Sequence, residues 1–485
     1  MRFLLFAFPL LVGCGLDLAA IVDLGQGGSE TSLDATSGPE SSTGSPDPTS
    51  TSASTTTTGT ETTTAGSDCT PDGDGHPDPA CPPDQPYCVA GACFSCETIN
   101  CSSVAPEEPL CNESTGLCVA CLCDDASPVC DPTAHTCSGC TAHSDCPMSA
   151  CDLWTGACFP SSDTLWVDKG DGCDDAGPGD EEIPLCGLDV AFDRIGAAAP
   201  GHQAVRVRPG SYAVTSTLRV PADHVVAVVH ATGNPGPPFV AITAAISSAL
   251  AVDPGGKLIV DTLHVPKSSI HGVVCTMGTA WLDRLTVSDA AMSGIVADGC
   301  ELVVRRSVLV SNVIGGVQLS GGSLRLENSY ISENGNPTTG VGGVYMTDGA
   351  SLTAVYSTWI DNRGPVGTPF SVACSDDGPK ENSAIRNSLA INPGFNTLCD
   401  GAIVDSTGWS TDVVTGDNLS IAFADRAKYL TPDGSLPGVY RVVAGSGLEG
   451  LGVWEQGDPA VDFDGDLRPT GDNSPDFAGA DRLAR

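Results

Sequence analysis

The sequence predicts an all-β fold, a parallel β-helix solenoid that follows a disordered linker and a small disulfide-rich region. Two repeated features carry this prediction: apolar strands recur every 22 residues from Lys257, and a short glycine motif recurs with the same step from His271. Glycine (57) and proline (36) are abundant and aromatic residues make up only 5% of the chain. This composition favours short strands and tight turns over long helices.

The strand repeat covers much of the C-terminal half. Its strands are expected to begin at Lys257, Thr279, Glu301, Ser323, Ser351 and Ser383. The glycine motif reads HGVV from His271, SGIV from Ser293, GGVQ from Gly315 and, after a five-residue insertion, GGVY from Gly342. Two independent features that share one period indicate a solenoid. A 22-residue coil accommodates three short strands and their turns, and coils stacked about 4.8 Å apart pair their backbones. We expect seven to nine coils.

The repeat also predicts which side chains point inward. The apolar ladder is expected to contain Leu258, Val260, Leu302, Val304, Leu324, Leu326 and Leu352. Three asparagines, Asn312, Asn334 and Asn362, fall at equivalent places in successive coils. We expect them to stack at a turn, in a structural role.

An amphipathic helix precedes the coils. Leu188, Ala191, Phe192 and Ile195 follow the i, i+3, i+4, i+7 spacing of one helix face. A strand over 204–207 and a Pro-Gly turn follow. This order resembles the entrance of right-handed parallel β-helices of the pectate-lyase-like type, in which such a helix covers the open end of the coil. The resemblance implies one β-helix domain over residues 161–485.

The C-terminal stretch resembles the closing segment of such proteins. The matching positions are Asp462, Gly465, Arg468, Pro469, Asp476, Gly479 and Ala480. The chain departs from that pattern by inserting Ala478 and ending the motif in Asp481. Only a capping role is therefore expected to carry over.

The N-terminus reads as an export signal. Arg2 precedes an apolar run of about ten residues, which is too short to span a bilayer. The segment over 11–14, Leu-Val-Gly-Cys, resembles the lipobox of bacterial lipoproteins, which implies a signal peptide over 1–13 and a lipid on Cys14. Lipidation would also explain why the chain has 23 cysteines, an odd number. The alternative is an ordinary signal peptide with a chance cysteine. Residues 14–68, rich in Ser and Thr, are expected to form a disordered tether.

Residues 69–160 contain sixteen cysteines in four sets of four. These are Cys69, Cys81, Cys88 and Cys93; Cys96, Cys101, Cys111 and Cys118; Cys121, Cys123, Cys130 and Cys137; and Cys140, Cys146, Cys151 and Cys158. Six residues separate the third and fourth cysteine in each of the last three sets. Because few aliphatic residues lie between them, each set needs covalent staples, and two disulfides per set is the simplest solution. Three connectivities stay open, and zinc at the C-x-x-C steps is the alternative.

The array resembles small Cys-rich repeats found in tandem in large exported bacterial proteins. Six cysteines remain in the β-helix region. They form three close pairs, Cys173 with Cys186, Cys275 with Cys300, and Cys374 with Cys399. The last two pairs are each separated by 25 residues, close to one coil, so each is expected to bridge adjacent coils.

The charge balance restricts the partners. Acidic residues outnumber basic ones 60 to 21, for a net charge of −39. Nucleic acid and anionic membrane surfaces would repel such a chain. Calcium is the one cofactor that the sequence suggests, because carboxylates alternate in two stretches. These candidate ligands are Asp72, Asp74 and Asp78, and Asp462, Asp464 and Asp466. Acidic turns in plain solvent are the competing interpretation.

No catalytic site is evident. Polygalacturonase-like hydrolases need several carboxylate strings, of which only Asp376-Asp377 is present, and neighbouring residues of a strand point to opposite faces. Arg305 and Arg306 with Asp283 would be conceivable lyase partners on neighbouring coils. We therefore expect an exported, lipid-anchored protein of the outer membrane or cell surface, with a non-catalytic β-helix that binds polysaccharide or surface proteins. The alternative function is that of a polysaccharide lyase or glycoside hydrolase.

Overall fold

The computed structural model describes most of the chain from Cys81 onwards. The described residues are 81, 87–89, 92–94, 110–112, 117–231, 240–244, 247–338, 340–365, 371–375, 383–392, 402–410 and 417–482. All of them belong to one compact unit, Gly66–Arg485. Within them, no helix combines the length and the apolar character that crossing a membrane requires.

Each set of four cysteines forms a small antiparallel hairpin. The four hairpins are β1 (Tyr87–Val89) with β2 (Ala92–Phe94), β3 (Leu110–Asn112) with β4 (Leu117–Val119), β5 (Val129–Asp131) with β6 (Thr136–Ser138), and β7 (Cys151–Asp152) with β8 (Ala157–Cys158). In every hairpin the third cysteine of the set lies directly opposite the fourth. The cysteine spacing therefore marks a repeated structural unit.

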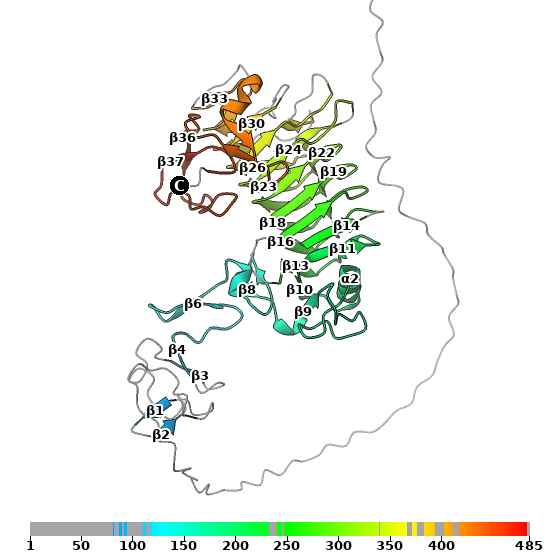
Figure 1. Cartoon of the computed structure of the whole chain (residues 1–485), viewed down its shortest axis with the longest axis vertical. Coiled ribbons are helices and arrows are strands. Elements are labelled where there is room, and N and C mark those ends of the chain that lie inside the picture. Colours follow the sequence, from blue (N-terminus) through cyan, green and yellow to red (C-terminus); the bar gives the residue numbers. More distant parts are fainter. Residues whose placement is uncertain are drawn as a thin grey trace, which may run out of the picture. The chain divides into compact units, whose positions relative to one another are not determined.

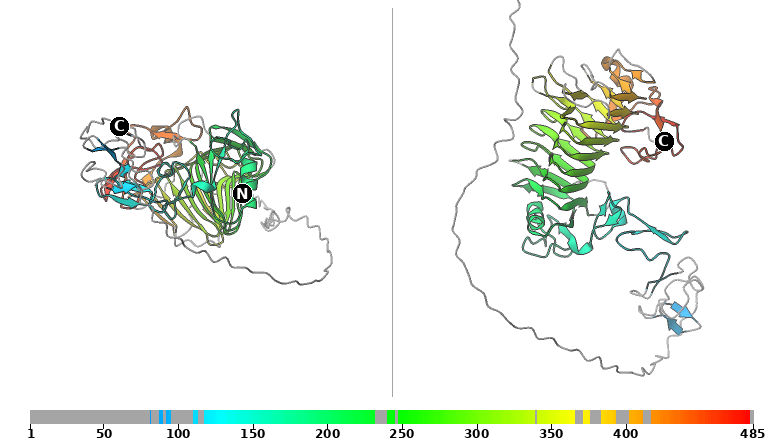
Figure 2. Two further views of the ribbon diagram at one scale, coloured as in Figure 1. Left: turned by 90° about the horizontal axis from the view of Figure 1, so that it is seen from below. Right: turned by 180° about the vertical axis from the view of Figure 1, so that it is seen from behind.

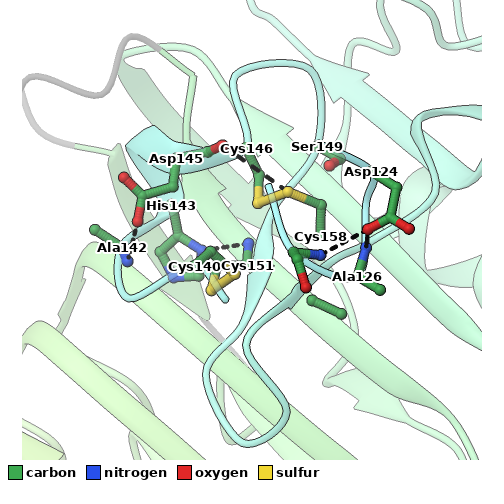
Figure 3. Close-up of a disulfide and its surroundings, with 12 residues drawn as sticks. Asp124, Ala126, Cys140, Ala142, His143, Asp145, Cys146, Ser149, Cys151 and Cys158 are labelled. Atoms are coloured by element: carbon green, nitrogen blue, oxygen red, sulfur yellow. Dashed lines mark hydrogen bonds between the residues drawn. A yellow bond between two sulfur atoms is a disulfide. The ribbon is translucent and has the colours of Figure 1, made fainter. Parts of the chain in front are cut away.

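The disulfides of the last two sets follow one rule, in which the first cysteine bonds to the third and the second to the fourth. The bonds are Cys121–Cys130, Cys123–Cys137, Cys140–Cys151 and Cys146–Cys158. The last two staple the hairpin shown in Figure 3. Because these sulfurs are bonded to one another, none is available as the thiolate that zinc requires. Of the first two sets, Cys81, Cys88 and Cys111 are also in disulfides.

The C-terminal region is a right-handed parallel β-helix whose coils each contribute to three parallel sheets (Figures 1 and 2). Sheet A contains β9 (Thr164–Val167), β10 (His202–Val207), β13 (Val225–His230), the first parts of β16 (Lys257–Pro266) and β18 (Thr279–Ser288), β20 (Glu301–Arg305), β23 (Ser323–Glu327), β26 (Ser351–Val355), β29 (Ala384–Arg386) and β31 (Ile403–Asp405). The starts of β16, β18, β20, β23 and β26 coincide with the predicted strand starts.

The other two sheets complete each coil. Sheet B contains β11 (Gly210–Val214), β14 (Val240–Ala244), the last parts of β16 and β18, β21 (Val308–Val310), β24 (Tyr330–Ser332), β27 (Thr358–Ile360), β30 (Leu389–Ile391), β32 (Gly408–Trp409) and β33 (Leu419–Ser420). Sheet C contains β12 (Leu218–Val220), β15 (Leu250–Val252), β17 (Val273–Thr276), β19 (Ser293–Asp298), β22 (Gly315–Ser320), β25 (Gly342–Thr347) and β28 (Val372–Cys374).

The chain turns between sheets through single residues with positive φ. The corner from sheet A to sheet B repeats this conformation in Thr262, Arg284, Arg306, Asn328, Tyr356, Asn387 and Ser406. The left-handed conformation is rare for non-glycine residues, and isolated cases are strained. Here each corner stacks on the next, so the regular backbone pairing of the flanking strands fixes the conformation.

The interior contains the predicted ladders. All seven predicted apolar residues, from Leu258 to Leu352, are buried. Asn312, Asn334 and Asn362 stack, because each side-chain oxygen accepts the backbone N–H of the corresponding residue one coil earlier, and Asn392 continues the column. The predicted structural role of the three asparagines is confirmed.

The glycine motif has a steric origin. A Cβ on Gly272, Gly294 or Gly316 would lie 2.7–2.8 Å from the carbonyl oxygen of the matching glycine in the next coil. The coils approach so closely here that no side chain fits. The recurring glycine motif therefore marks the place where the backbones of neighbouring coils touch.

Helix α2 (Leu188–Ala197) lies at the N-terminal end of the coils and buries Leu188, Ala191, Phe192 and Ile195 in the main core, as the spacing predicts. A disulfide joins Cys173 to Cys186 just before this helix. Since the helix contacts β9, β11 and β12, it closes the first coil against solvent.

The Cys275–Cys300 disulfide bridges two adjacent coils. Cys275 is in register with Ala297, three residues before Cys300. The chain turns at Gly299 (φ 61°), which directs the buried Cys300 back towards Cys275. The corner accounts for the three-residue offset from the coil period. Cys374 is also in a disulfide, whereas Cys399 lies outside the described residues.

The C-terminal segment packs along the flank of the β-helix, on the outer surface of sheet B. Its hairpins, β34 (Leu430–Pro432) with β35 (Tyr440–Val442) and β36 (Glu449–Trp454) with β37 (Ser474–Phe477), follow the 3-10 helix η4 (Phe423–Lys428). The cluster includes Val308, Tyr330, Ile360, Leu389 and Ile391 of sheet B. In these coils sheet B presents apolar side chains on both of its faces, and the C-terminal segment buries those on the outer face. We call this segment the flank cover. It covers the side of the β-helix, whereas the sequence resemblance predicts only a capping role.

Candidate binding surface

The outer surface of sheet A carries a row of charged and aromatic side chains that contact one another. Three outward-facing columns run across its coils, set by the parallel register. The middle column contains Ile259, Trp281, Val303 and Arg325, and the column nearest sheet B contains Asp261, Asp283, Arg305 and Glu327. Parallel strands place equivalent residues of neighbouring coils about 4.8 Å apart. Residues 22 apart in sequence therefore lie side by side.

Two aspartates of the column nearest sheet B, Asp261 and Asp283, are each paired with an arginine from the next coil. Arg284 binds Asp261 with two hydrogen bonds, Nε–Oδ1 at 2.7 Å and Nη2–Oδ2 at 2.5 Å. Arg306 binds Asp283 in the same way, with Nε–Oδ1 at 2.9 Å. Both arginines occupy the left-handed corner position, which turns their side chains back across the previous coil. Bidentate pairs of this kind are strong and geometrically specific.

One partner of each ion pair has a shifted pKa. Burial alone would raise the pKa of Asp261, but the hydrogen bonds and charge of Arg284 hold that pKa below its ordinary value. Burial opposes the charge of Arg306, yet its contact with Asp283 raises the pKa of the guanidinium. Both aspartates are more than nine-tenths buried. Both oxygens of each aspartate accept hydrogen bonds from an arginine, so neither carboxylate is free to contact a substrate.

Further along sheet A, Arg305 and Arg325 both pair with the carboxylate of Glu327. Arg305 Nε lies 3.0 Å from one oxygen of Glu327, and Arg325 Nε lies 2.5 Å from the other. Glu327 is buried, whereas the Arg325 side chain is half exposed, at 51%. Two positive charges on one negative charge leave a net cation on this part of sheet A. In a chain of net charge −39, this is a local reversal of sign.

Two tryptophans meet beside these arginines. Trp281 of β18 and Trp154 of the β7–β8 hairpin have ring centroids 6.2 Å apart and planes at 85°. Lys257 Nζ lies 5.6 Å from the centroid of Trp154, and the Arg305 guanidinium lies 5.5 Å from that of Trp281. Both indoles are half-buried. The contact joins the last cysteine repeat to the β-helix.

The site residues predicted from the sequence are only partly brought together in the structure. Asp283 and Arg306 do lie together, but as a closed ion pair; Arg305 turns to Glu327 instead. Cys14, Asp72, Asp74, Asp78, Asp376 and Asp377 lie outside the described residues. Sequence reasoning missed Trp281, Arg325 and Glu327, although the 22-residue step would have placed Arg305 beside Glu327. No sequence signal pointed to the Trp154 contact.

The second calcium candidate forms a turn. Asp462 is buried, and its Oδ1 accepts the backbone N–H groups of Asp464, Gly465 and Asp466, while its Oδ2 accepts that of Arg482. The carboxylate of Asp464 binds Arg441 instead. Within the described residues, Asp462, Asp464 and Asp466 do not form a group of three carboxylates close enough to share one ion. Asp462 thus organises a turn through backbone N–H groups, and calcium binding here stays a prediction.

Comparison with known proteins yields few matches. The profile of a family described as "Family of unknown function (DUF8331)" matches residues 56–164, which include the cysteine repeats and end where sheet A begins. No curated protein matches. Among solved structures, a pectate lyase, Pel9A, is 14% identical with a TM-score of 0.36, covering 65% of this chain and 95% of its own. A rhamnogalacturonan lyase is 12% identical with a TM-score of 0.33, covering 51% and 73%. A pectin methylesterase solved with a hexasaccharide is 13% identical with a TM-score of 0.26, covering 55% and 94%.

Proposed function

We propose that this protein is exported, anchored through a lipid on Cys14, and binds polysaccharide without cleaving it along the outer surface of sheet A. The observation that carries the proposal is the pairing of the carboxylates in the column nearest sheet B. Asp261, Asp283 and Glu327 are all engaged by arginines. The half-buried Trp281 and the half-exposed Arg325 lie beside them on the same surface. A surface of aromatic rings and guanidinium groups suits a chain of sugars that carries carboxylates.

Aromatic and arginine side chains match the two features of such a ligand. The C–H faces of a sugar ring pack on an indole, and a carboxylate accepts hydrogen bonds from a guanidinium. The pair formed by Arg305 and Arg325 on Glu327 retains unused N–H donors, because an arginine has five. The locked aspartates favour binding over hydrolysis or elimination, both of which need a group that can take up a proton.

The test uses the mature protein with polygalacturonate, with and without calcium. Binding is measured by affinity electrophoresis, and cleavage by the appearance of reducing ends and of unsaturated ends that absorb ultraviolet light. We expect retardation without either product. Arg325→Ala should weaken binding, whereas the matched control Arg219→Ala, an exposed arginine paired with Asp253 away from sheet A, should not. Product formation would establish the enzyme alternative, and equal effects of the two variants would refute the proposed surface.

The anchor has its own test. Cys14→Ser should move the protein from the membrane fraction to the soluble exported fraction, and mass spectrometry of the wild-type N-terminus should find an acylated Cys14. An unmodified N-terminus generated elsewhere would support an ordinary signal peptide instead.

A further inference from the structure

We infer that the last cysteine repeat forms one wall of the binding surface on sheet A, with Trp154 as a ligand-contact residue. The inference rests on the proposed function and extends it to a part of the chain outside the β-helix. Trp281 forms the floor on the sheet, and Trp154 stands at 85° to it. Lys257 and Arg305 lie beside the two rings. A sugar in this corner could pack on one ring and contact the edge of the other.

The repeat is held in place by contacts other than Trp154. The buried Arg206 of β10 donates to the carbonyl oxygens of Ser149 at 2.6 Å and Cys146 at 3.2 Å. Phe159, directly after the hairpin, is 1% exposed and packs with Ala204, Val229, Ile259 and other residues of sheet A. Figure 3 shows Cys146 and Ser149 in the loop that presents these carbonyls. Docking therefore does not require an aromatic residue at the hairpin tip.

The hairpin itself does not require one either. Trp154 is the third residue after Cys151, and the equivalent positions in the two preceding repeats are Ser114 and Thr133. The turn is formed by other groups, since Asp152 Oδ1 accepts the Trp154 N–H just as Asp131 Oδ1 accepts the Thr133 N–H. Among these three repeats, only the last has an indole at this position, and that repeat contacts sheet A.

The two disulfides hold the wall rigid. Cys140–Cys151 and Cys146–Cys158 fasten both strands of the hairpin to the loop that Arg206 anchors. A binding residue gains affinity when it is ordered before the ligand arrives. The repeat thus supplies an aromatic wall whose position is set before the ligand binds.

The experiment compares full-length Trp154→Ala and Trp154→Phe with the tip control Thr155→Ala, using polygalacturonate and affinity electrophoresis. We expect at least a tenfold weaker interaction for Trp154→Ala, near-complete recovery for Trp154→Phe, and no change for Thr155→Ala. If the alanine variant misfolds, Trp154→Leu, an apolar side chain without an aromatic ring, takes its place and should bind about tenfold more weakly than wild type. An unchanged guanidinium unfolding midpoint shows that the Phe and Leu variants are folded.

The outcomes separate the two proposals. If Arg325→Ala weakens binding and no Trp154 variant does, the sheet A surface stands and the composite wall is wrong. If the wild-type protein binds no polygalacturonate, the proposed function and this inference both fall. Recovery of binding in Trp154→Leu would also overturn the wall, because apolar packing against sheet A would then explain the loss without an aromatic contact to the ligand.

Discussion

Replacing Asn334 by alanine removes the middle of the asparagine ladder. The side-chain oxygen of Asn334 accepts the backbone N–H of Asn312 at 3.1 Å and its side-chain amide at 2.8 Å. Its own amide donates to the Leu309 carbonyl oxygen at 2.8 Å and to Asn362 at 3.1 Å. All four contacts are fully buried, so water cannot replace them.

The expected cost follows from the groups left behind. The side-chain amide of Asn312 still donates a hydrogen bond to the Val287 carbonyl oxygen. The side-chain oxygen of Asn362 still accepts one from the backbone N–H of residue 334. The Asn312 backbone N–H and the side-chain bond to the Leu309 carbonyl have no such replacement. An unsatisfied buried group costs about 1–3 kcal/mol, so two of them should lower the free energy of unfolding by roughly 2–6 kcal/mol.

Guanidinium unfolding of the mature protein, followed by tryptophan fluorescence, measures this loss. The matched control is Asn336→Ala, two residues further on, whose hydrogen bonds to Val313 and from Thr338 lie at the surface. It should lose less than about 1 kcal/mol. Similar midpoints for the two variants would refute the reasoning that the buried ladder stabilises the coils.

Three further outcomes are expected. Replacing Cys275 and Cys300 together by alanine should cost roughly 3 kcal/mol, the loop entropy of a 25-residue bridge, and an unchanged guanidinium midpoint would contradict this. Burial raises the pKa of Asp481 to about 7, so the folded protein holds this proton more tightly than the unfolded chain does. The resulting stability is lost as the pH rises from about 4 through 7. In Asp481→Asn, the melting temperature should therefore change less with pH over this range than in wild type. Phe463→Ala removes the edge-to-face contact with Tyr330, whose ring centroid lies 5.0 Å away. Hydrogen exchange of backbone amides in the C-terminal segment should then be faster than in wild type. An unchanged exchange rate would contradict the stabilising role of this segment's packing on sheet B.

The coils were predictable because their interior is periodic. Each inward residue of one coil touches its equivalent in the next, so the constraint that selects Leu258 also selects Leu302 and Leu324 one step at a time. Asn312 and Gly316 repeat for the same reason. A pattern that every coil must satisfy can be read without knowing where any coil lies in space.

The flank cover left a weaker signal. Sheet B strands read VLV from Val308, TWI from Thr358 and LAI from Leu389, with little of the alternation expected for a strand that has one face in water. Continuous apolar runs belong to strands buried on both faces. They predict that something covers sheet B, but three-residue strands do not specify which segment. The Trp154 contact has no periodic signal, because among the described residues it joins only the last cysteine repeat to sheet A.

The charged column shows how stacking restricts chemistry on this fold. Asp261 and Asp283 are in register on adjacent coils, about 4.8 Å apart along the stacking direction, and two buried carboxylates at that spacing repel each other. An arginine at each following corner relieves the repulsion, as Arg284 and Arg306 do. The same contacts occupy the oxygens of both carboxylates and keep them from a substrate. An enzyme on this column would need one carboxylate without its arginine, so Arg306→Met is the change that would bring Asp283 closest to catalytic behaviour, at the cost of an unpaired buried charge.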